Sequence, residues 1–417
     1  MNVLKGKRIL LGITGSIAAF KAAELASGLT QMDALVDVIL TPAGEKFITP
    51  LTLQSVTGRR AYTEADLWGG EAHVLHVGLG HSADLMVIAP CTANTLARLA
   101  HGEADNLLTI TALALQCPLL IAPAMDGGML DHPATRENLA KLKERGATIA
   151  GPAEGHLASG LSGKGRLLEP EVLIGHIRLL LGRNGRLASK KVVVSAGGTQ
   201  EPLDPVRVLT NRSSGKQGYA LAQAAIDAGA SVTLITTPTV LTPPIGARVL
   251  AVQTAKQMLD AVLSESADAD VLIMAAAVAD FRPKQIEGKK MKKRDGIPQI
   301  ELEETEDILE AVARRRSGSP SLQPGATGRK AAAGHPCLMV GFAAESHDLL
   351  VNAGEKLRSK GLDLIVANDI SSKESGFGMD TNRVTLLYPD GKQEALPLMN
   401  KSEVANTIIE RVAALLG

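Results

Sequence analysis

The stretch from Ser195 to Gly218 constrains the fold more than any other part of the chain. An apolar run, Lys191–Ser195, leads directly into the glycine turn Gly197–Thr199, and the polar segment Asn211–Lys216 then opens a helical run. A strand, a glycine turn and a helix start let the backbone approach an anion closely and aim free N–H groups at it. This order predicts a phosphate or nucleotide site. The alternative is a strand-to-helix connection that holds no ligand.

Length and composition narrow the class of protein. A chain of 417 residues predicts two or three domains. Lysine plus arginine equal aspartate plus glutamate, which argues against a chain-wide nucleic-acid binder, and 2% aromatics offer no stacking platform for single strands. Three separated cysteines without a C-x-x-C motif suit a reducing cytoplasm, and no apolar run reaches the length of a membrane span. We therefore expect a cytoplasmic protein with neither nucleic-acid nor membrane partners.

The first half reads as a doubly wound α/β domain. Apolar runs predict strands at Arg8–Ile13, Ala34–Leu40, Asp84–Ala89, Pro118–Ala122 and Thr148–Ala150. Small or polar residues follow the strands, and in an open parallel sheet this edge binds ligands. The residues expected there are Thr14, Ser16, Thr41, Thr92 and Asn94. Each could instead cap a helix, but together they favour a phosphorylated cofactor. The G-x-G-x-x-G fingerprint of dinucleotide sites is missing.

Two segments of the first half stay open to more than one interpretation. His73, His76 and His81 invite a metal site, but no carboxylate or cysteine pattern supports one, and a single ligand-contacting histidine is favoured. The glycine-rich segment 151–166 is too long for a turn and is typical of a mobile flap over a site. Linker composition at 182–189 places the boundary between domains 1–189 and 190–417.

The second half also alternates strands and helices, which predicts a second doubly wound domain. Strands are expected at Lys191–Ser195, Ser231–Ile235, Val271–Ala275, Cys337–Phe342, Asp363–Ala367 and Arg383–Tyr388. Small residues and then Asp280 end the third of these, where a flat ligand could lie close and a carboxylate could take a ribose hydroxyl. The lysine-rich run 283–298 is either a solvated face or a loop that closes over a triphosphate. Residues 314–336 read as a flexible insertion.

Long motifs occur in family order along the chain. On them the first half resembles the flavin-binding phosphopantothenoylcysteine decarboxylase family, and the second half resembles its fused partner, phosphopantothenate–cysteine ligase. The first-half motifs are GITGSIAAFKA, FITPLTLQSVTG, HVGLGHSADLMVIAPCTANTLARLAHGEADNLL, APAM and GHLASGLSGKGRLLEPE. The resemblance covers essentially the whole chain. It implies a bifunctional enzyme of coenzyme A synthesis with two Rossmann-like domains, the first flavodoxin-like.

For the first half, the resemblance implies that FMN oxidises the cysteine thiol of the substrate to a thioaldehyde, which accepts electrons as carbon dioxide leaves. The implied cofactor-binding residues are Gly15, Ser16, Thr41, Thr92, Asn94 and Met125, and the implied catalytic histidine is His76. Asp126 stands where many relatives have asparagine, and Ser159 where many have a proton-donating cysteine. An ionised Asp126 would repel the substrate carboxylate and could bind it only if protonated. Serine is also a far weaker acid than cysteine.

For the second half, the resemblance implies activation of the 4′-phosphopantothenate carboxylate by CTP, with Mg²⁺ on the phosphates, and then attack by the amino group of cysteine. Asn211 matches the residue that supports this second step. The implied nucleotide-binding residues are Met274, Ala275, Ala276, Asp280, Lys290, Asp307, Phe342, Lys356 and Lys360. The implied substrate-binding residues are Gly198, Arg207, Ser213, Ser214 and Lys216. Flavin-domain trimers and ligase-domain dimers of the family imply a homo-oligomer, up to a dodecamer.

Two other functions are weighed against the bifunctional enzyme. Because of Asp126 and Ser159, the flavin-binding half could be weak or regulatory while the ligase stays active. A nicotinamide-dependent oxidoreductase is disfavoured because neither half carries the glycine fingerprint.

Overall fold

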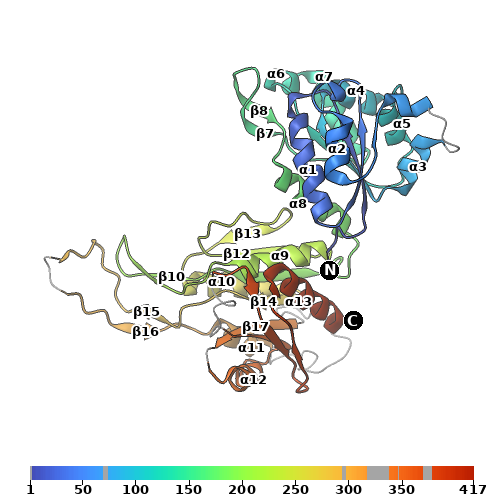
Figure 1. Cartoon of the computed structure of the whole chain (residues 1–417). Helices are drawn as coiled ribbons and strands as arrows, with labels where there is room; N and C mark the ends of the chain where they lie inside the picture. The colour runs from blue at the N-terminus through green and yellow to red at the C-terminus, as the bar shows by residue number, and fades with distance from the viewer. Residues whose placement is uncertain (1, 69–73, 294–296, 317–337, 346, 370–377) are drawn as a thin grey trace. The chain divides into compact units, whose positions relative to one another are not determined.

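The computed structural model describes residues 2–68, 74–293, 297–316, 338–345, 347–369 and 378–417. The chain divides into two compact units, Asn2–Leu181 and Gly182–Gly417 (Figure 1). The predicted insertion at 314–336 lies outside the described residues except for its first three, and so do His73 and Cys337. Within the described ranges, no helix is both long and apolar enough to cross a membrane.

A six-stranded parallel sheet forms the centre of the first unit, in the order β3-β2-β1-β4-β5-β6. Its strands are β1 (Arg8–Ile13), β2 (Leu35–Leu40), β3 (Ala61–Tyr62), β4 (Leu85–Cys91), β5 (Leu119–Pro123) and β6 (Thr148–Ile149). Five of them follow the predicted strands closely, whereas β3 is only two residues long and had no apolar run to mark it. The order reverses between β1 and β4, and such a switch point opens a crevice at the carboxyl ends of the strands.

Helices cover both faces of this sheet because alternate side chains of each strand point to opposite sides. Leu11 and Ile13 of β1 pack with α1 (Phe20–Gln31), α2 (Pro50–Thr57) and α8 (Pro170–Gly182). Leu10, the residue before Leu11, packs on the other face. The helices there are α3 (Leu75–Ser82), α4 (Ala93–His101), α5 (Leu107–Leu113) and α7 (Pro133–Glu144).

The segment predicted as a flap folds as a hairpin of β7 (Ala153–His156) and β8 (Ser162–Arg166). The hairpin packs on the loop after β5, where Met125 N donates to Gly165 O at 3.0 Å. Gly165 has a φ of +146°, and a Cβ there would overlap Met125 O. Glycine is therefore required for this close approach, which places the tip of the hairpin beside the short helix α6 (Gly127–Asp131).

The second unit is built on an eight-stranded sheet in the order β13-β12-β9-β14-β17-β18-β20-β21. Its strands are β9 (Lys191–Ala196), β12 (Ser231–Thr236), β13 (Arg248–Ala251), β14 (Val271–Met274), β17 (Leu338–Glu345), β18 (Leu364–Asp369), β20 (Val384–Leu387) and β21 (Gln393–Ala395). The first six are parallel, with the strand order of the first unit. The last two run antiparallel, so the sheet is mixed rather than wholly parallel.

Helices again lie on both faces of the sheet. The helices α10 (Ala255–Glu265), α11 (Ile308–Arg316) and α12 (Leu349–Ser359) share one core with the sheet. The helices α9 (Lys216–Asp227) and α13 (Lys401–Leu416) pack on each other, side by side in Figure 1. The short 3₁₀ helices of the chain are η1 (Ile17–Ala19), η2 (Gly44–Lys46), η3 (Glu64–Trp68) and η4 (Ser266–Asp268).

Three short antiparallel pairs complete the second unit. They are β10 (Gln200–Pro202) with β11 (Val208–Thr210), β15 (Phe281–Pro283) with β16 (Leu302–Glu304), and β19 (Thr381–Asn382) with β22 (Met399–Asn400). The chain between β15 and β16 projects from the body of the unit as an arm (Figure 1). This arm carries the lysine-rich run noted in the sequence.

Candidate active sites

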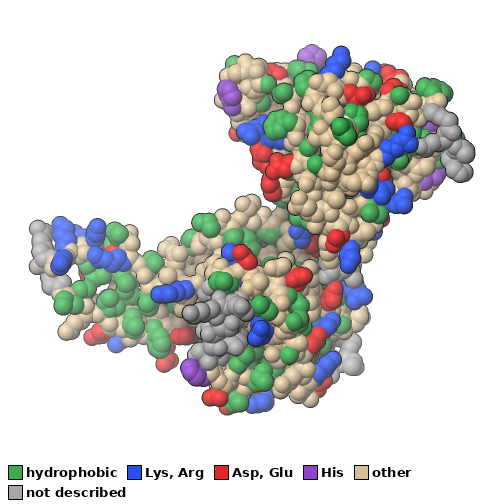
Figure 2. Space-filling model, viewed as in Figure 1, with side chains coloured by type: hydrophobic (Ala, Val, Ile, Leu, Met, Phe, Trp, Pro, Cys, Tyr) green, Lys and Arg blue, Asp and Glu red, His purple; other side chains and the backbone are tan. Residues whose placement is uncertain are grey.

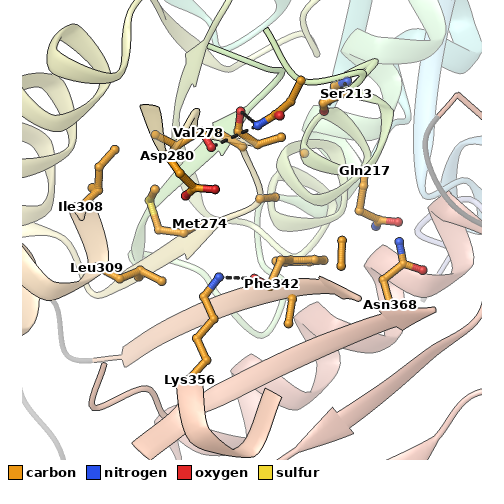
Figure 3. Close-up of a pocket in the computed structure, with 18 of the residues that line it drawn as sticks. Ser213, Gln217, Met274, Val278, Asp280, Ile308, Leu309, Phe342, Lys356 and Asn368 are labelled. Atoms are coloured by element: carbon orange, nitrogen blue, oxygen red, sulfur yellow. Dashed lines mark hydrogen bonds between the residues drawn. The ribbon is translucent and has the colours of Figure 1, made fainter. Parts of the chain in front are cut away.

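A cavity of about 650 Å³ lies at the carboxyl ends of β9 and β14, where the strand order of the second unit reverses. Its lining includes Asn211, Ser213, Ser214, Gly215, Lys216, Gln217, Met274, Ala275, Ala276, Asp280, Asp307, Phe342, Lys356, Asn368, Asn382 and Lys401. These residues come from segments far apart in the sequence (Figure 3). The switch point explains why the segments 211–218 and 274–278 meet here, since the strands that precede them end at the same edge of the sheet.

Hydrogen bonds hold the loops after β9 and β14 together. Ser195 Oγ accepts from Ala276 N at 3.1 Å, and Thr199 Oγ1 accepts from Ala279 N at 2.9 Å. A Cβ on Gly218 would lie 2.5 Å from the Cβ of Ala196, so only glycine lets α9 pack this close to β9. The amino-terminal end of α9 therefore faces the cavity, where its N–H groups suit an anion.

Asn211 lies at the edge of this cavity. Its Nδ2 donates to Ala277 O at 3.3 Å and to Val278 O at 3.1 Å, shown as dashed lines in Figure 3. The carboxamide is thus held against the end of β14. The role of Asn211 in amide formation stays a prediction, and the structure places the residue on the cavity wall.

The cavity has an acidic end and a basic end. Asp280, Glu304, Glu306 and Asp307 line one end, which Thr305 ties together by donating to Ala279 O through its hydroxyl at 2.6 Å. Lys216 and Lys401 line the other, and Figure 3 shows Asp280 across the cavity from Gln217. Lys356 lies between the two ends, donating to Phe342 O at 3.0 Å.

The acidic end has a donor set that fits Mg²⁺ bound together with phosphates. Magnesium is usually held by one or two protein carboxylates, and substrate phosphates and water complete its coordination. Within the described residues, no group of three or more His, Cys, Asp or Glu side chains is arranged to hold a metal unaided.

Four residues predicted for this site do not line the cavity: Gly198, Arg207, Lys290 and Lys360. Arg207 pairs instead with the buried carboxylate of Asp204, which also accepts from Met291 N at 3.1 Å. This contact joins the β10–β11 turn to the arm, where Lys290 is exposed. Burial disfavours the charge of Lys360, but its ion pairs with Asp307 and Glu310 raise its pKa overall.

The cavity also contains residues that the sequence did not single out. Asn368 comes directly after the predicted strand Asp363–Ala367 and lies near the carboxyl end of β18, so the strand-end pattern could have indicated it. Gln217, Asn382 and Lys401 belong to no strand-end pattern. They reach the cavity because α9, β19 and α13 converge on it.

In the first unit, the loops after β1 and β4 meet at the other switch point. The buried Thr14 hydroxyl donates to Pro90 O at 2.7 Å and accepts from Thr92 N at 3.0 Å. Ser16 and Thr92 both cap helices, accepting from Ala18 N and Thr95 N, so the capping alternative holds for these two. Thr41 likewise accepts from Gly44 N at 3.1 Å. These contacts hold together the loops at the carboxyl ends of the strands, and we call this edge of the sheet the rim.

The rim keeps a donor set that fits the phosphate and ring of FMN. Asn94 is exposed at the start of α4, and the N-termini of η1 and α4 both open onto this edge. A Cβ on Gly15 would lie 2.5 Å from the Cβ of Ala43, so glycine allows the loops after β1 and β2 to meet. His76 is half-buried in the first turn of α3.

Asp126 and Ser159 form a direct contact across the hairpin. Ser159 Oγ donates to Asp126 Oδ2 at 2.7 Å, and Gly128 N donates to Asp126 Oδ1 at 2.9 Å. The hydrogen bond from Ser159, and then that from Gly128, lower the pKa of Asp126. The structure therefore opposes the protonated form that the sequence had suggested for carboxylate binding.

Neither described cysteine can replace the missing flap thiol. Cys91 is completely buried at the end of β4, and burial raises its pKa far above the ordinary range. Cys117 precedes β5, so it lies at the amino-terminal edge of the sheet, opposite Met125. Protons for a ligand at the rim must come from other groups.

Two family models match the chain. The model described as "Flavoprotein" matches residues 2–181, and the "DNA/pantothenate metabolism flavoprotein C-terminal domain" matches residues 187–416. Among solved structures, the C-terminal domain of a coenzyme A biosynthesis bifunctional protein CoaBC is 37% identical and covers 56% of this chain and 98% of its own, with a TM-score of 0.45. The FMN-binding protein AtHal3 is 35% identical over 42% of this chain and 96% of its own, with a TM-score of 0.38.

Curated relatives match over both halves at once. "Coenzyme A biosynthesis bifunctional protein CoaBC" of Bacillus subtilis is 42% identical, covering 99% of this chain and 98% of its own length. That of Mycobacterium tuberculosis strain H37Rv is 43% identical over 99% of this chain and 97% of its own. Full-length agreement favours two working enzymes over a regulatory flavin-binding half. The chain belongs to the family of bifunctional coenzyme A biosynthesis proteins that joins a phosphopantothenoylcysteine decarboxylase to a phosphopantothenate–cysteine ligase.

Proposed function

We propose that the second unit joins cysteine to 4′-phosphopantothenate at the expense of CTP, and that the first unit decarboxylates the product to 4′-phosphopantetheine with FMN. The observation that carries this proposal is the polarised cavity at the β9/β14 switch point. Its acidic end suits a ribose and Mg²⁺, and its basic end suits anions.

The ligase chemistry follows in two balanced steps. The 4′-phosphopantothenate carboxylate attacks the α-phosphorus of CTP, and pyrophosphate leaves. The amine of cysteine then attacks the acyl carbon, forming the C–N bond as the C–O bond to CMP breaks and the amine loses a proton. Lys216, Lys356 and the N-terminus of α9 stabilise phosphate charge, and Asn211 orients the acyl group.

In the first unit, FMN would supply the two-electron oxidation and reduction that surround the loss of carbon dioxide. The residues proposed to hold it are Ser16, Thr92, Asn94 and Met125, on the rim between β1 and β4. His76 lies on the neighbouring α3 and acts as the base. The β7–β8 hairpin brings Ser159 next to Asp126, on the loop after β5.

We also propose that the enzyme is a homo-oligomer in the cytoplasm. The arm exposes Phe281, Ile286, Ile297 and Leu302, with Ile297 95% exposed. Figure 2 shows hydrophobic side chains and lysines together along it. Apolar side chains on a projecting segment are typical of an interface between chains.

A coupled assay tests the proposed function. The protein, loaded with FMN and Mg²⁺, is supplied with 4′-phosphopantothenate, CTP and cysteine, and pyrophosphate and carbon dioxide are followed together. We expect one carbon dioxide for each pyrophosphate. Release of pyrophosphate without carbon dioxide would contradict the decarboxylase activity. Release of neither product would contradict the whole proposal. Replacing CTP by ATP measures the nucleotide preference.

A further inference from the structure

The basic end of the cavity holds a buried lysine that no part of the proposed mechanism uses. Lys401 is the first residue of α13, is only 8% exposed, and lines the cavity together with Lys216. Both lysines also line a second cavity of about 460 Å³, so they lie where the two cavities meet. Asp380 faces them and pairs with Lys216 at 2.6 Å. Two lysines on one cavity wall favour a ligand that carries an anion.

Two successive hydrogen bonds join Lys401, Gln217 and Asn382, and their donors and acceptors can be assigned in only one way. Gln217 Nε2 donates to Lys401 O at 3.3 Å, and Asn382 Nδ2 donates to Gln217 Oε1 at 3.5 Å. A backbone carbonyl can only accept, so it orients Gln217, and Gln217 in turn orients Asn382. The carboxamide oxygen of Asn382 is therefore the last acceptor in this row of hydrogen bonds.

That oxygen lacks a donor. Asn382 is 2% exposed and lines the cavity, and within the described part of the protein its Oδ1 accepts no hydrogen bond. Buried polar atoms are almost always paired, so an orphaned acceptor on a cavity wall indicates a ligand that brings an N–H or O–H group. The neighbouring lysines indicate that the same ligand carries an anion.

An α-amino acid carries both groups two bonds apart. A fully ionised phosphate supplies charge but no donor, and a ribose supplies donors but no charge. Burial, and then repulsion from Lys216, lower the pKa of Lys401 although Asp380 raises it, and a bound carboxylate would favour the charged form of this lysine further. Of the three substrates of the ligase, cysteine is the one in which an amine and a carboxylate lie this close together.

We propose that Lys401 and the Gln217–Asn382 amide pair form the cysteine subsite of the ligase, with Lys401 binding the α-carboxylate and Asn382 Oδ1 accepting from the amine. The proposal rests on the ligase function given above. An amine held by this hydrogen bond keeps its lone pair directed away from Asn382, toward an acyl group in the cavity. The subsite thus positions the nucleophile and selects for a carboxylate.

The test compares cysteine with cysteamine, which has the same amine and thiol but no carboxylate. In the unmodified protein we expect kcat/KM for cysteine to exceed that for cysteamine by about tenfold or more, the usual size of a charge-assisted contact. Lys401→Met should remove this preference by slowing only cysteine. Lys401→Arg should keep it. Equal kcat/KM for the two amines in the unmodified protein would overturn the proposal without any variant.

Two further measurements separate this proposal from its premise. Exchange of pyrophosphate into CTP in the presence of 4′-phosphopantothenate needs no cysteine, and Lys401→Met should leave it within about twofold. A loss of exchange in that variant would assign Lys401 to a phosphate instead and would overturn the subsite. Absence of exchange in the unmodified protein would contradict the ligase itself. Lys256→Met, which removes an exposed lysine paired with Asp260, is the matched control and should change nothing.

Discussion

At the scale of single residues, the contact between Asp126 and Ser159 decides the charge of the first active site. Two donors hold the Asp126 carboxylate in its ionised form, and its lowered pKa means that it stays charged at every pH above its ordinary value of 3.8. If the substrate carboxylate binds here, it meets a like charge. The decarboxylase would then bind its substrate with lower affinity than relatives that have asparagine at this position.

Asp126→Asn should therefore lower KM for 4′-phosphopantothenoylcysteine. Removing one like charge from beside the substrate carboxylate should lower KM by about fivefold, the order expected for neighbouring charges in water. Because the carboxylate is already fully ionised above pH 5, the ratio of the two KM values should stay constant from pH 6 to pH 9. Asp131→Asn, on the same short helix and paired with Arg136, is the control. An unchanged KM would place the substrate carboxylate elsewhere.

Substitution of Asn211 is the most direct test of the mechanism proposed for the second active site. Asn211→Asp would place carboxylate oxygens against the carbonyls of Ala277 and Val278, where the amide now donates. We expect the acyl-nucleotide to form and amide formation to fall about 10²-fold or more, because the side chain that orients the acyl group is displaced from these carbonyls. Quenched reaction mixtures should contain the acyl-cytidylate. Normal turnover would remove Asn211 from the mechanism.

The sequence predicted some of these residues better than others, for a physical reason. Asp280, Phe342 and the serines before α9 follow strands or open a helix, and the sheet topology alone brings such positions to one edge. Lys290 and Arg207 lie on the arm and its neighbouring turn, whose direction no local pattern fixes. Lys401 and Asn382 come from the C-terminal segment, and only the packing of α13 on α9 places them in the cavity.

At the scale of elements, buried strands and long helices were predictable because their apolar periodicity is strong. The short antiparallel pairs were not. The β7–β8 hairpin is rich in glycine, and β15–β16 lies beside a charged run, so neither shows alternation. The sequence also did not predict that β20 and β21 pair antiparallel at the edge of the sheet, because a strand's sequence does not reveal its orientation.

The hairpin offers a matched pair of glycines for a test of its function. Gly165→Ala would force the Cβ against Met125 O and displace β8, whereas a Cβ at Gly163 in the same strand meets no atom within 4 Å. We expect Gly165→Ala to reduce carbon dioxide release at least tenfold and Gly163→Ala to stay within about twofold. Pyrophosphate release should be normal in both. Equal effects would show that the hairpin's position on the Met125 loop does not matter for decarboxylation.

At the scale of the whole molecule, the same strand order occurs twice, and each copy opens a site at its own switch point. Each unit also has its own hydrophobic core. The described hydrogen bonds that build each site lie within one unit. We therefore expect a substitution in one unit to impair only the reaction of that unit. The molecule that passes between the two units is 4′-phosphopantothenoylcysteine.

This independence predicts complementation between two defective chains. Asn211→Asp is slowed in ligation and Gly165→Ala in decarboxylation, so either variant alone should convert 4′-phosphopantothenate, CTP and cysteine to 4′-phosphopantetheine only slowly. A mixture of the two should be faster than either variant after a lag, because the intermediate must first accumulate in solution. The lag should shorten as the concentration of Asn211→Asp protein rises, and that protein alone should release carbon dioxide from added 4′-phosphopantothenoylcysteine. A mixture no faster than either variant, although each chain keeps its own half-reaction, would mean that the intermediate is transferred within one chain and does not reach solution.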